Sequence, residues 1–535
     1  MTSLLRSTRV MALGTVASRA TGFLRTAMVA LVLGLGGVGV AFNVANTAPN
    51  IVYELLLGGI LTSVVVPLLV RAAKDDEDGG LSYAQRLLSL TVLVLGGASV
   101  LLVLLAPAIV DLYLDDSTDP ATRDLAVLFA RFFLPQVLFY GAGAVMGAYL
   151  NTRGRFGPPM WAPVLNNVVV ILTGVVFLLM PGPADLTSGT ITSAQTTVLG
   201  IGVTLGIVAQ TLVLVPALRA TGFRFVPRLD VRGVGLGPAG RLAKWVVLFV
   251  VANQLALLVV VNLATRASAL SPGRGYPSYV YAYVLWQLPH AVVAVSVITA
   301  LMPRMSRAAA DGRTAELRSS LAEGLRLVLV VLVPAAVAYV VLGRSIATLI
   351  FGYAQVDTEE ARFIGVLLGV FALGLVPFSV YQLQLRSFYA MQDTRTPTLI
   401  NLAVNATVVL VDLVLFAVLP DDLKVVGLAA GQAASYVVGL VVVSRVLRRR
   451  TGGLHGARVV RTAVRCLAAA VPPGLLALGV ATLVARLLGT GPLGAGVTLL
   501  VAGAVLLGGY LLLVSRMRVP EVQQALRPVL ARLGR

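Results

Sequence analysis

Charged and metal-binding side chains are scarce in this chain of 535 residues. Only 12% of the residues are charged, and the chain has one cysteine (Cys466) and two histidines (His290 and His455). A single cysteine excludes an intramolecular disulfide and a cysteine-based metal cluster. No Ser/His/Asp or Cys/His constellation and no P-loop motif is recognisable, so we expect neither an enzyme nor a self-contained ATP-driven motor.

Hydrophobic residues dominate instead and make up 58% of the chain. A helix needs about 20 apolar residues to cross a hydrocarbon core of about 30 Å. Runs of this kind recur from one end of the chain to the other, and we count fourteen, the second of them over residues 41–70. The composition therefore predicts an all-α polytopic membrane protein with fourteen transmembrane helices.

The basic residues that give the net charge of +19 are spread over the predicted loops and are not gathered in one stretch of the chain. When loops are assigned alternately to the two sides, most of the Lys and Arg fall on the side of both chain ends, whereas acidic loops such as 111–119 fall on the other side. This is the positive-inside pattern, with both termini cytoplasmic. The basic character therefore indicates topology and contact with membrane lipids, not nucleic acid.

The chain also contains an internal duplication. Residues 64–76 resemble 298–312, and residues 134–153 resemble 376–395. An offset of about 240 residues spans an even number of helices, as in transporters built from parallel repeats with the substrate site between them. We expect two six-helix lobes related by a parallel pseudo-two-fold repeat, plus two extra C-terminal helices. The expected boundaries are 1–218 for the N-lobe, 219–240 for a basic linker, 241–450 for the C-lobe, 451–518 for the last two helices and 519–535 for an amphipathic cytoplasmic tail.

Two arginines, Arg19 and Arg25, interrupt the first hydrophobic segment. An arginine at a helix centre costs about 2.5–3.5 kcal/mol on insertion scales, so such residues face protein or water and mark functional sites. Gly14, Ser18 and Gly22 form a ridge of small residues that permits close helix approach.

A polar face on the second helix is expected to face these arginines. Asn43, Asn46, Asn50 and Glu54 are spaced three, four and four residues apart, which places them on one side of a helix. One interpretation is a buried ion pair of Glu54 with Arg25 that only fixes packing. The other is a hydrated cationic cavity that binds an anion, and we prefer it because the asparagines offer more hydrogen-bonding groups than packing requires.

In the second lobe Tyr283, Gln287 and His290 have helical spacing and suit a sugar or peptide headgroup. The alternative for aromatic residues here, above all Tyr276 and Tyr279, is an interfacial belt.

Two further polar sets lie within predicted spans. Arg131 is another intramembrane cation, for which Asp124 is the candidate partner. Asn401, Asn405 and Asp412 form a stripe that predicts either a cation site of oxygen ligands or hydrogen bonds between helices.

Several stretches together resemble a known family. SRATGFLR (18–25), NVANTAPNIVYELLLGGILTSVVVPLL (43–69) and NTRGRFGPPMWAPVLNN (151–167) are similar to the MurJ/MviN family of lipid II flippases, part of the MOP exporter superfamily. The resemblance implies a bacterial plasma-membrane protein that moves the undecaprenyl-diphosphate-linked peptidoglycan precursor from the inner to the outer leaflet by alternating access. It also implies that the last two spans shelter the lipid tail.

The same resemblance assigns substrate-binding roles to Arg19, Arg25 and Arg131, whereas the family's second-span arginine falls at Tyr53. It implies no cofactor, with the membrane potential, Na+ or H+ as the driving force, and cell-wall synthesis or division proteins as candidate partners. The alternatives are a flippase of another polyprenyl-linked glycan, a drug/cation antiporter of the same superfamily, or a non-transporting scaffold for cell-wall synthesis. A cavity with two arginines and one carboxylate argues against export of cationic drugs.

Overall fold

The computed structural model describes residues 2–54, 66–183, 185–228, 230, 236–517, 519 and 521. The chain divides by its internal contacts into two compact units, Met1–Pro272 and Gly273–Arg535. Within the described residues both units consist of helices joined by short connections, without a β-strand.

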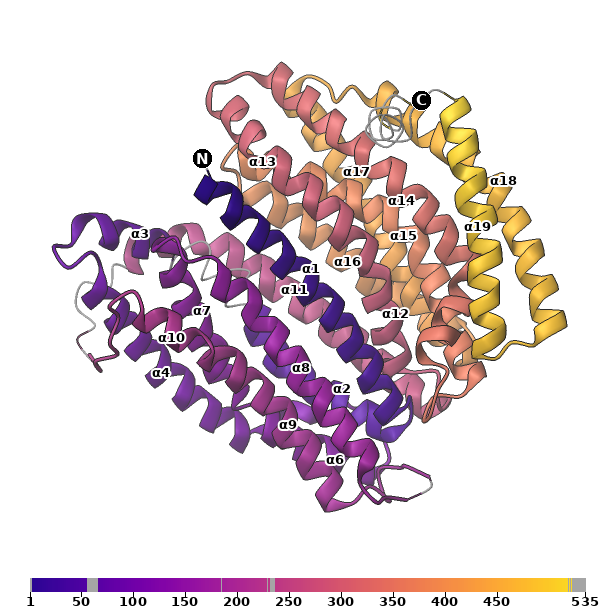
Figure 1. Cartoon of the computed structure of the whole chain (residues 1–535), viewed down its shortest axis with the longest axis horizontal. Helices are drawn as coiled ribbons and strands as arrows, with labels where there is room; N and C mark the ends of the chain where they lie inside the picture. The colour runs from indigo at the N-terminus through magenta and orange to yellow at the C-terminus, as the bar shows by residue number, and fades with distance from the viewer. Residues whose placement is uncertain are drawn as a thin grey trace. The chain divides into compact units, whose positions relative to one another are not determined.

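The first unit holds eleven helices within the described part of the chain (Figure 1). They are α1 (Thr2–Leu33), α2 (Gly37–Glu54), α3 (Val66–Asp75), α4 (Leu81–Leu104), α5 (Ala106–Asp111), α6 (Pro120–Phe133), α7 (Gln136–Thr152), α8 (Gly157–Leu179), α9 (Ser193–Leu212), α10 (Leu214–Arg219) and α11 (Leu236–Leu270).

The second unit contains longer helices and two short turns of other helix types. They are α12 (Tyr276–Pro289), the π-helix η2 (His290–Ala294), α13 (Val295–Ala310), α14 (Thr314–Phe351), α15 (Thr358–Ala390), α16 (Arg395–Val418), the 3-10 helix η3 (Asp421–Leu423), α17 (Lys424–Thr451), α18 (Gly456–Leu488) and α19 (Pro492–Arg516).

The predicted membrane architecture is confirmed. Thirteen helical segments of the described residues are long and apolar enough to cross a membrane. The remaining expected span, 41–70, falls on α2, on α3 and on residues 55–65, which lie outside the described residues. Most of the expected C-terminal tail also lies outside the described residues.

Local sequence signals set where several of these helices begin. Before α9, Thr192 Oγ1 accepts a hydrogen bond from the Gln195 backbone amide at 3.2 Å, and Gln195 Oε1 accepts one from the Thr192 amide at 3.0 Å. Asp357 and Glu360 make the same reciprocal pair before α15, at 2.7 and 3.2 Å. Each capping box satisfies backbone donors that the first turn of a helix leaves unpaired.

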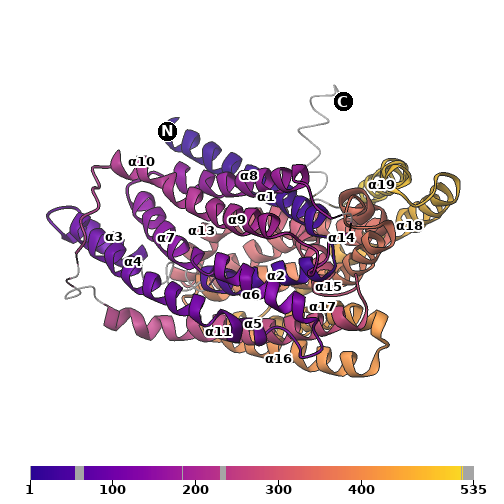
Figure 2. The ribbon, with the colours of Figure 1, turned by 90° about the horizontal axis from the view of Figure 1, so that it is seen from below.

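Apolar packing holds the last two helices to the rest of the second unit. α18 and α19 run side by side, drawn in yellow, and both contact α14 (Figures 1 and 2). Leu342 of α14, Ala477 of α18 and Leu506 of α19 are buried in one hydrophobic cluster. The far faces of α18 and α19 carry exposed leucines, as expected for helices in contact with lipid.

The seventh span, α11, belongs to the first unit by its contacts. Thr265 Oγ1 donates to the Tyr113 carbonyl oxygen at 2.7 Å, and Arg266 Nε lies 3.4 Å from Asp115 Oδ2. The packing boundary therefore lies one helix later than the predicted linker, 219–240. The lobes defined from the sequence repeat stay a prediction.

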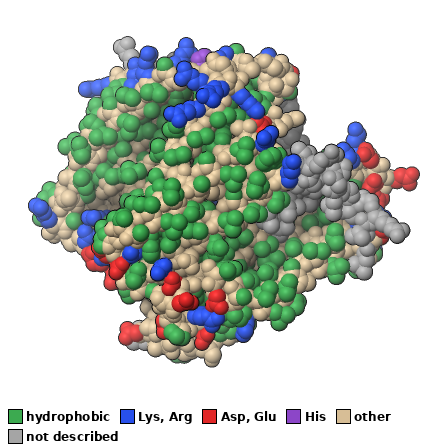
Figure 3. All heavy atoms as spheres, turned by 180° about the vertical axis from the view of Figure 1, so that it is seen from behind, with side chains coloured by type: hydrophobic (Ala, Val, Ile, Leu, Met, Phe, Trp, Pro, Cys, Tyr) green, Lys and Arg blue, Asp and Glu red, His purple; other side chains and the backbone are tan. Residues whose placement is uncertain are grey.

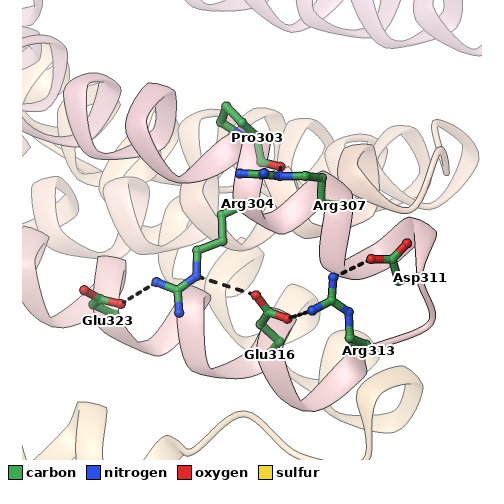
Figure 4. Close-up of polar contacts among 7 residues, drawn as sticks. All are labelled: Pro303, Arg304, Arg307, Asp311, Arg313, Glu316 and Glu323. Atoms are coloured by element: carbon green, nitrogen blue, oxygen red, sulfur yellow. Dashed lines mark hydrogen bonds and ion pairs between the residues drawn. The ribbon is translucent and has the colours of Figure 1, made fainter.

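Charged side chains concentrate at the ends of the helices. The face in Figure 3 has a broad hydrophobic area with Lys, Arg, Asp and Glu gathered toward its margins. One such cluster ties α13 to α14 (Figure 4): Arg304 lies 3.8 Å from Glu316 and 3.3 Å from Glu323, and Arg313 binds both Glu316 and Asp311. Exposed pairs of this kind contribute little individually, about 0–1 kcal/mol each.

Candidate functional site

The ridge of small residues on α1 packs against α8, as its sequence predicts. A Cβ on Gly14 would lie 2.9 Å from Trp161 Nε1, and one on Gly22 would lie 3.5 Å from Asn167 Nδ2. Asn167 Nδ2 also donates to the Ser18 carbonyl oxygen at 3.2 Å. Because α8 covers this ridge, the two arginines to either side of it are held in a defined orientation.

Neither intramembrane arginine of α1 is neutralised by an ion pair among the described residues. Arg19 is exposed, whereas Arg25 is half-buried. The groups that interact electrostatically with Arg25 are the phenol groups of Tyr140 on α7 and Tyr53 on α2, and Arg19 interacts with Tyr53 as well. Arg25 therefore interacts with two phenol groups and has no carboxylate partner among the described residues.

Glu54 does not form the ion pair with Arg25 that the packing interpretation requires. Its Oε2 accepts a hydrogen bond from Gln254 Nε2 of α11 at 3.4 Å, and the side chain is exposed. The contact joins positions 200 residues apart within the first unit. Glu54 thus connects α2 to α11 instead of locking α1.

The asparagines of α2 differ in their exposure and in the hydrogen bonds that their side chains make. Asn43 Nδ2 donates to the Gly39 carbonyl oxygen of its own helix at 2.8 Å. Asn50 is exposed, and its Oδ1 accepts from the Tyr140 hydroxyl at 3.5 Å. Asn46 is half-buried. Asn50 is therefore the asparagine of α2 that contacts Tyr140, which interacts electrostatically with Arg25.

Two tyrosines and a small cavity complete this site. The rings of Tyr53 and Tyr140 lie 4.6 Å apart between centroids, and both line a cavity of about 160 Å³. The polar side chains Asn151, Gln210 and Thr211 line it as well. One water needs about 10–15 Å³ of such space, so the cavity has room for several waters. Tyr140 could not be identified from the sequence, because a lone tyrosine in an apolar helix carries no periodic signal.

The prediction that Asp124 is the partner of Arg131 is wrong. Asp124 lies 3.8 Å from Arg123, which also makes a two-pronged contact with Asp111 at 2.7 and 2.8 Å. A carboxylate at the start of α6 is nearer to its own first turn than to Arg131 in the last turn of that helix. Arg131 is exposed, and its predicted substrate contact remains a prediction.

In the second unit, two of the three predicted headgroup residues take part in an aromatic cluster. Tyr283 lies 5.2 Å from Trp286 and 5.7 Å from Phe371 between ring centroids. His290 Nδ1 is 2.9 Å from Ser379 Oγ, and its backbone begins the π-helix η2. Gln287 is half-buried between them. The headgroup role of these three side chains stays a prediction.

The interfacial belt, the alternative for Tyr276 and Tyr279, does not describe these two residues. They are 5% and 6% exposed, so they are packed inside the unit and do not face a membrane surface.

The polar stripe on α16 does not converge on one point. At about 1.5 Å rise per residue, Asn401 and Asp412 lie about 16 Å apart along the helix axis, so one ion cannot touch all three side chains. Asn401 and Asp412 are buried, and Asn405 is half-buried. Neither carboxylate oxygen of Asp412 has a hydrogen-bond partner among the described residues. The cation site stays a prediction. Asp412 is the one of the three side chains that offers a buried carboxylate without a hydrogen-bond partner among the described residues.

Comparisons with known proteins identify the family of the chain. The sequence model of the family "Lipid II flippase MurJ" matches residues 29–499. The "Probable lipid II flippase MurJ" of Rhizobium meliloti (strain 1021) is 28% identical over 407 residues, which cover 74% of this chain and 73% of that protein. The "Lipid II flippase MurJ" of Burkholderia cenocepacia is 28% identical over 411 residues, covering 73% of this chain and 74% of that protein.

Solved structures share the fold at lower sequence identity. "Lipid II flippase MurJ, inward closed conformation" superposes with a TM-score of 0.70 at 17% identity and covers 92% of this chain and 98% of that chain. "Inward-facing conformation of a multidrug resistance MATE family transporter of the MOP superfamily" gives 0.66 at 15% identity, covering 82% and 96%. Since the family match extends over most of its length, the chain belongs to the lipid II flippase MurJ family, a family of multi-pass bacterial membrane transporters and not of enzymes.

Proposed function

We propose that this protein translocates lipid II, the polyprenyl-diphosphate-linked peptidoglycan precursor, from the inner to the outer leaflet by alternating access. Family membership supports the lipid-linked substrate. The single observation that carries the proposal in this chain is the half-buried guanidinium of Arg25, which interacts electrostatically with Tyr140 and Tyr53 and lacks an ion pair among the described residues.

Arg25 has a physical reason to bind an anion. An unpaired cation in a membrane-spanning helix costs about 2.5–3.5 kcal/mol. A diphosphate offsets this cost through charge-assisted, two-pronged hydrogen bonds that suit the planar guanidinium. In this proposal Arg25 and Arg19 bind the diphosphate, while Asn46, Asn50 and Glu54 hydrogen-bond the attached glycan.

The direction of transport follows from charge. We place both termini in the cytoplasm, where the basic loops lie by the positive-inside rule. An inside-negative potential favours outward movement of an anionic headgroup by about 2.3 kcal/mol per charge per 100 mV. A coupling ion, Na+ or H+, could add to this force, and Asp412 is the buried carboxylate that could bind one.

The test replaces Arg25 in cells that depend on this protein, followed by an assay of lipid II accessible at the outer face. Arg25→Ala and Arg25→Glu are expected to abolish translocation, and Arg25→Lys to retain part of it, because lysine keeps the charge but not the two-pronged geometry. Arg449→Ala removes a positive charge from an exposed position on α17 and serves as the matched control.

The outcomes separate the proposal from its alternatives. Full translocation with both Arg25→Ala and Arg25→Glu contradicts the proposed role of Arg25. If lipid II stays accessible at normal levels after depletion of the protein while another polyprenyl-linked glycan accumulates inside, the substrate assignment is wrong. Growth that tolerates every arginine variant but not changes in the basic loops favours the scaffold.

A further inference from the structure

A basic pocket lies at one end of the last helices of the second unit. It is a cavity of about 120 Å³ where α14, α15 and the α18–α19 hairpin meet. Arg344 and Arg362 both line it. The hydroxyl side chains at this pocket are Ser345, Thr348, Thr482, Thr490 and Thr498.

Two glycines bring together the helices that carry these arginines. A Cβ on Gly343 would lie 2.7 Å from the Gly365 carbonyl oxygen, and a Cβ on Gly365 would overlap the backbone of Arg344. The backbones of α14 and α15 therefore touch at this level, as small residues in membrane helices allow. Arg344 adjoins this contact on α14, and Arg362 lies one turn before Gly365 on α15.

Acidic side chains balance the charge at the pocket only in part, because Glu359 pairs with Arg362 and no carboxylate among the described residues pairs with Arg344. Arg362 Nη1 lies 3.0 Å from Glu359, whose side chain is 75% exposed. Among the described residues Arg344 makes no ion pair, and its side chain is exposed. Like charges held together at a membrane helix end cost free energy, and an anion shared between them offsets that cost.

The size of the pocket limits its ligand. One water needs about 10–15 Å³ of such space, so a cavity of about 120 Å³ has room for a phosphate group. It is smaller than the roughly 300–1,000 Å³ of a pocket for a drug-sized ligand. Guanidinium groups and hydroxyls are the donors that a phosphate accepts from.

The surroundings of the pocket are apolar. Leu349 next to Thr348 is 38% exposed, Leu483 next to Thr482 is 56% exposed, and Leu487 and Leu493 are 73% and 89% exposed. Exposed leucines on membrane-spanning helices face acyl chains. A ligand that satisfies both the pocket and its rim has a phosphate head and a hydrocarbon tail.

We propose that Arg344 and Arg362, with the hydroxyls around them, form a binding site for the phosphate headgroup of a membrane lipid. The pocket lies at the ends of α14 and α18, so with cytoplasmic termini it faces the outer leaflet. The site is separate from Arg25, and its occupancy does not depend on translocation.

Lipid binding to the purified full-length protein in nanodiscs tests the inference. The probes are phosphatidylglycerol in a phosphatidylcholine background, a long-chain polyprenyl phosphate in the same background, and inorganic phosphate. Arg344→Gln and Arg362→Gln are each expected to weaken binding of a phosphate-headed lipid by roughly tenfold or more, as expected for a lost charge-assisted hydrogen bond. Arg344→Lys is expected to retain more affinity than Arg344→Gln.

Arg486→Gln is the matched control, because Arg486 is exposed on the last turn of α18 but does not line the pocket. Equal loss in Arg486→Gln and Arg344→Gln would show a diffuse charge effect and overturn the site. Binding of inorganic phosphate as tight as that of either lipid would overturn the lipid assignment. Preference for phosphatidylglycerol or for polyprenyl phosphate supports the site and identifies the lipid class. Unfolding temperatures of all variants exclude misfolding as the cause.

Discussion

Gln254 of α11 donates a hydrogen bond from its side-chain amide to Glu54 Oε2 of α2, over 3.4 Å. Each residue is the other's partner, whereas the ion pair of Glu54 with Arg25 was one of two interpretations of the sequence. Because Glu54 makes this contact, its carboxylate does not neutralise the arginines of α1. It also makes Glu54 a structural link within the first unit, whose effects can be measured apart from those of Arg25.

Replacement of Glu54 by glutamine is expected to keep the link between α2 and α11, because Gln Oε1 can still accept from Gln254. Glu54→Ala and Gln254→Ala are expected to lower the unfolding temperature of the purified protein. A double-mutant cycle between the two positions should give a coupling of about 0.5–1.5 kcal/mol, the usual net value of one hydrogen bond. A coupling indistinguishable from zero would mean that the contact does not hold α2 to α11.

Alanine at Gly365 is expected to destabilise the second unit by about 1–3 kcal/mol, the usual cost of overpacking. The added methyl group would overlap the backbone of Arg344 on α14, and backbone cannot move aside as a side chain can. Gly369→Ala, one turn later on α15, is the control, because its Cβ would lie 3.7 Å from the nearest atom.

The control should be neutral or gain up to about 1 kcal/mol from the better helix propensity of alanine. Thermal unfolding in detergent compares the two variants. Equal stability of both would show that α14 and α15 are not in backbone contact at Gly365.

A carboxylate between α15 and α16 makes part of the stability pH-dependent. Asp393 accepts from the Thr396 backbone amide at 3.0 Å and from the Thr396 hydroxyl at 2.6 Å, and it pairs with Arg450 of α17. Burial raises the pKa of Asp393, but the hydrogen bonds from Thr396 and the guanidinium of Arg450 outweigh this effect and hold the pKa below its usual value.

A carboxyl whose pKa is lower in the folded state stabilises the fold above its unfolded pKa of about 3.9, and this contribution is lost as the pH falls through the folded value. Asp393→Asn is therefore expected to lower the free energy of unfolding at pH 7 by about 1–3 kcal/mol. The unfolding temperature should fall with it. The difference from the wild type should shrink as the pH is lowered below 3.9. Asp116→Asn, at an exposed position, is the control. A difference that stays constant from pH 7 to pH 3 would contradict the pKa assignment.

Hydropathy and residue spacing were sufficient for the architecture and for one helix contact. Apolar runs predicted the spans, and the ridge of Gly14, Ser18 and Gly22 predicted the close approach that α8 makes. Both signals are local, since they depend on the residues of one helix and on the thickness of the bilayer.

Pairings between helices were harder to predict. Asp124 has Arg123 beside it and Arg131 a heptad away, and spacing alone does not choose between them. Gln254 and Glu54 meet only because two helices far apart in the chain pack together. Tyr140 gains its place beside Arg25 from the packing of α7, which no pattern within that helix encodes.

Asp412 offers the sharpest test of ion coupling. It is 0% exposed, and neither of its carboxylate oxygens has a hydrogen-bond partner among the described residues. A Cβ on Gly431 of α17 would overlap Oδ1, so glycine at this position makes room for the carboxylate. An unpaired buried carboxylate is costly unless it binds a cation or a proton.

If Asp412 binds Na+, a Na+ concentration of 100 times the dissociation constant should raise the free energy of unfolding of the wild type by about 2.7 kcal/mol. The unfolding temperature should rise with it. Asp412→Asn should abolish this response and should be as stable as the wild type, or more so, without Na+. The control is Asp421→Asn, which changes an exposed carboxylate paired with Lys424 and should leave the Na+ response intact. An equal response to K+ and Na+ in all three proteins would show that the stabilisation is an effect of ionic strength. A proton would then be the candidate ligand of Asp412.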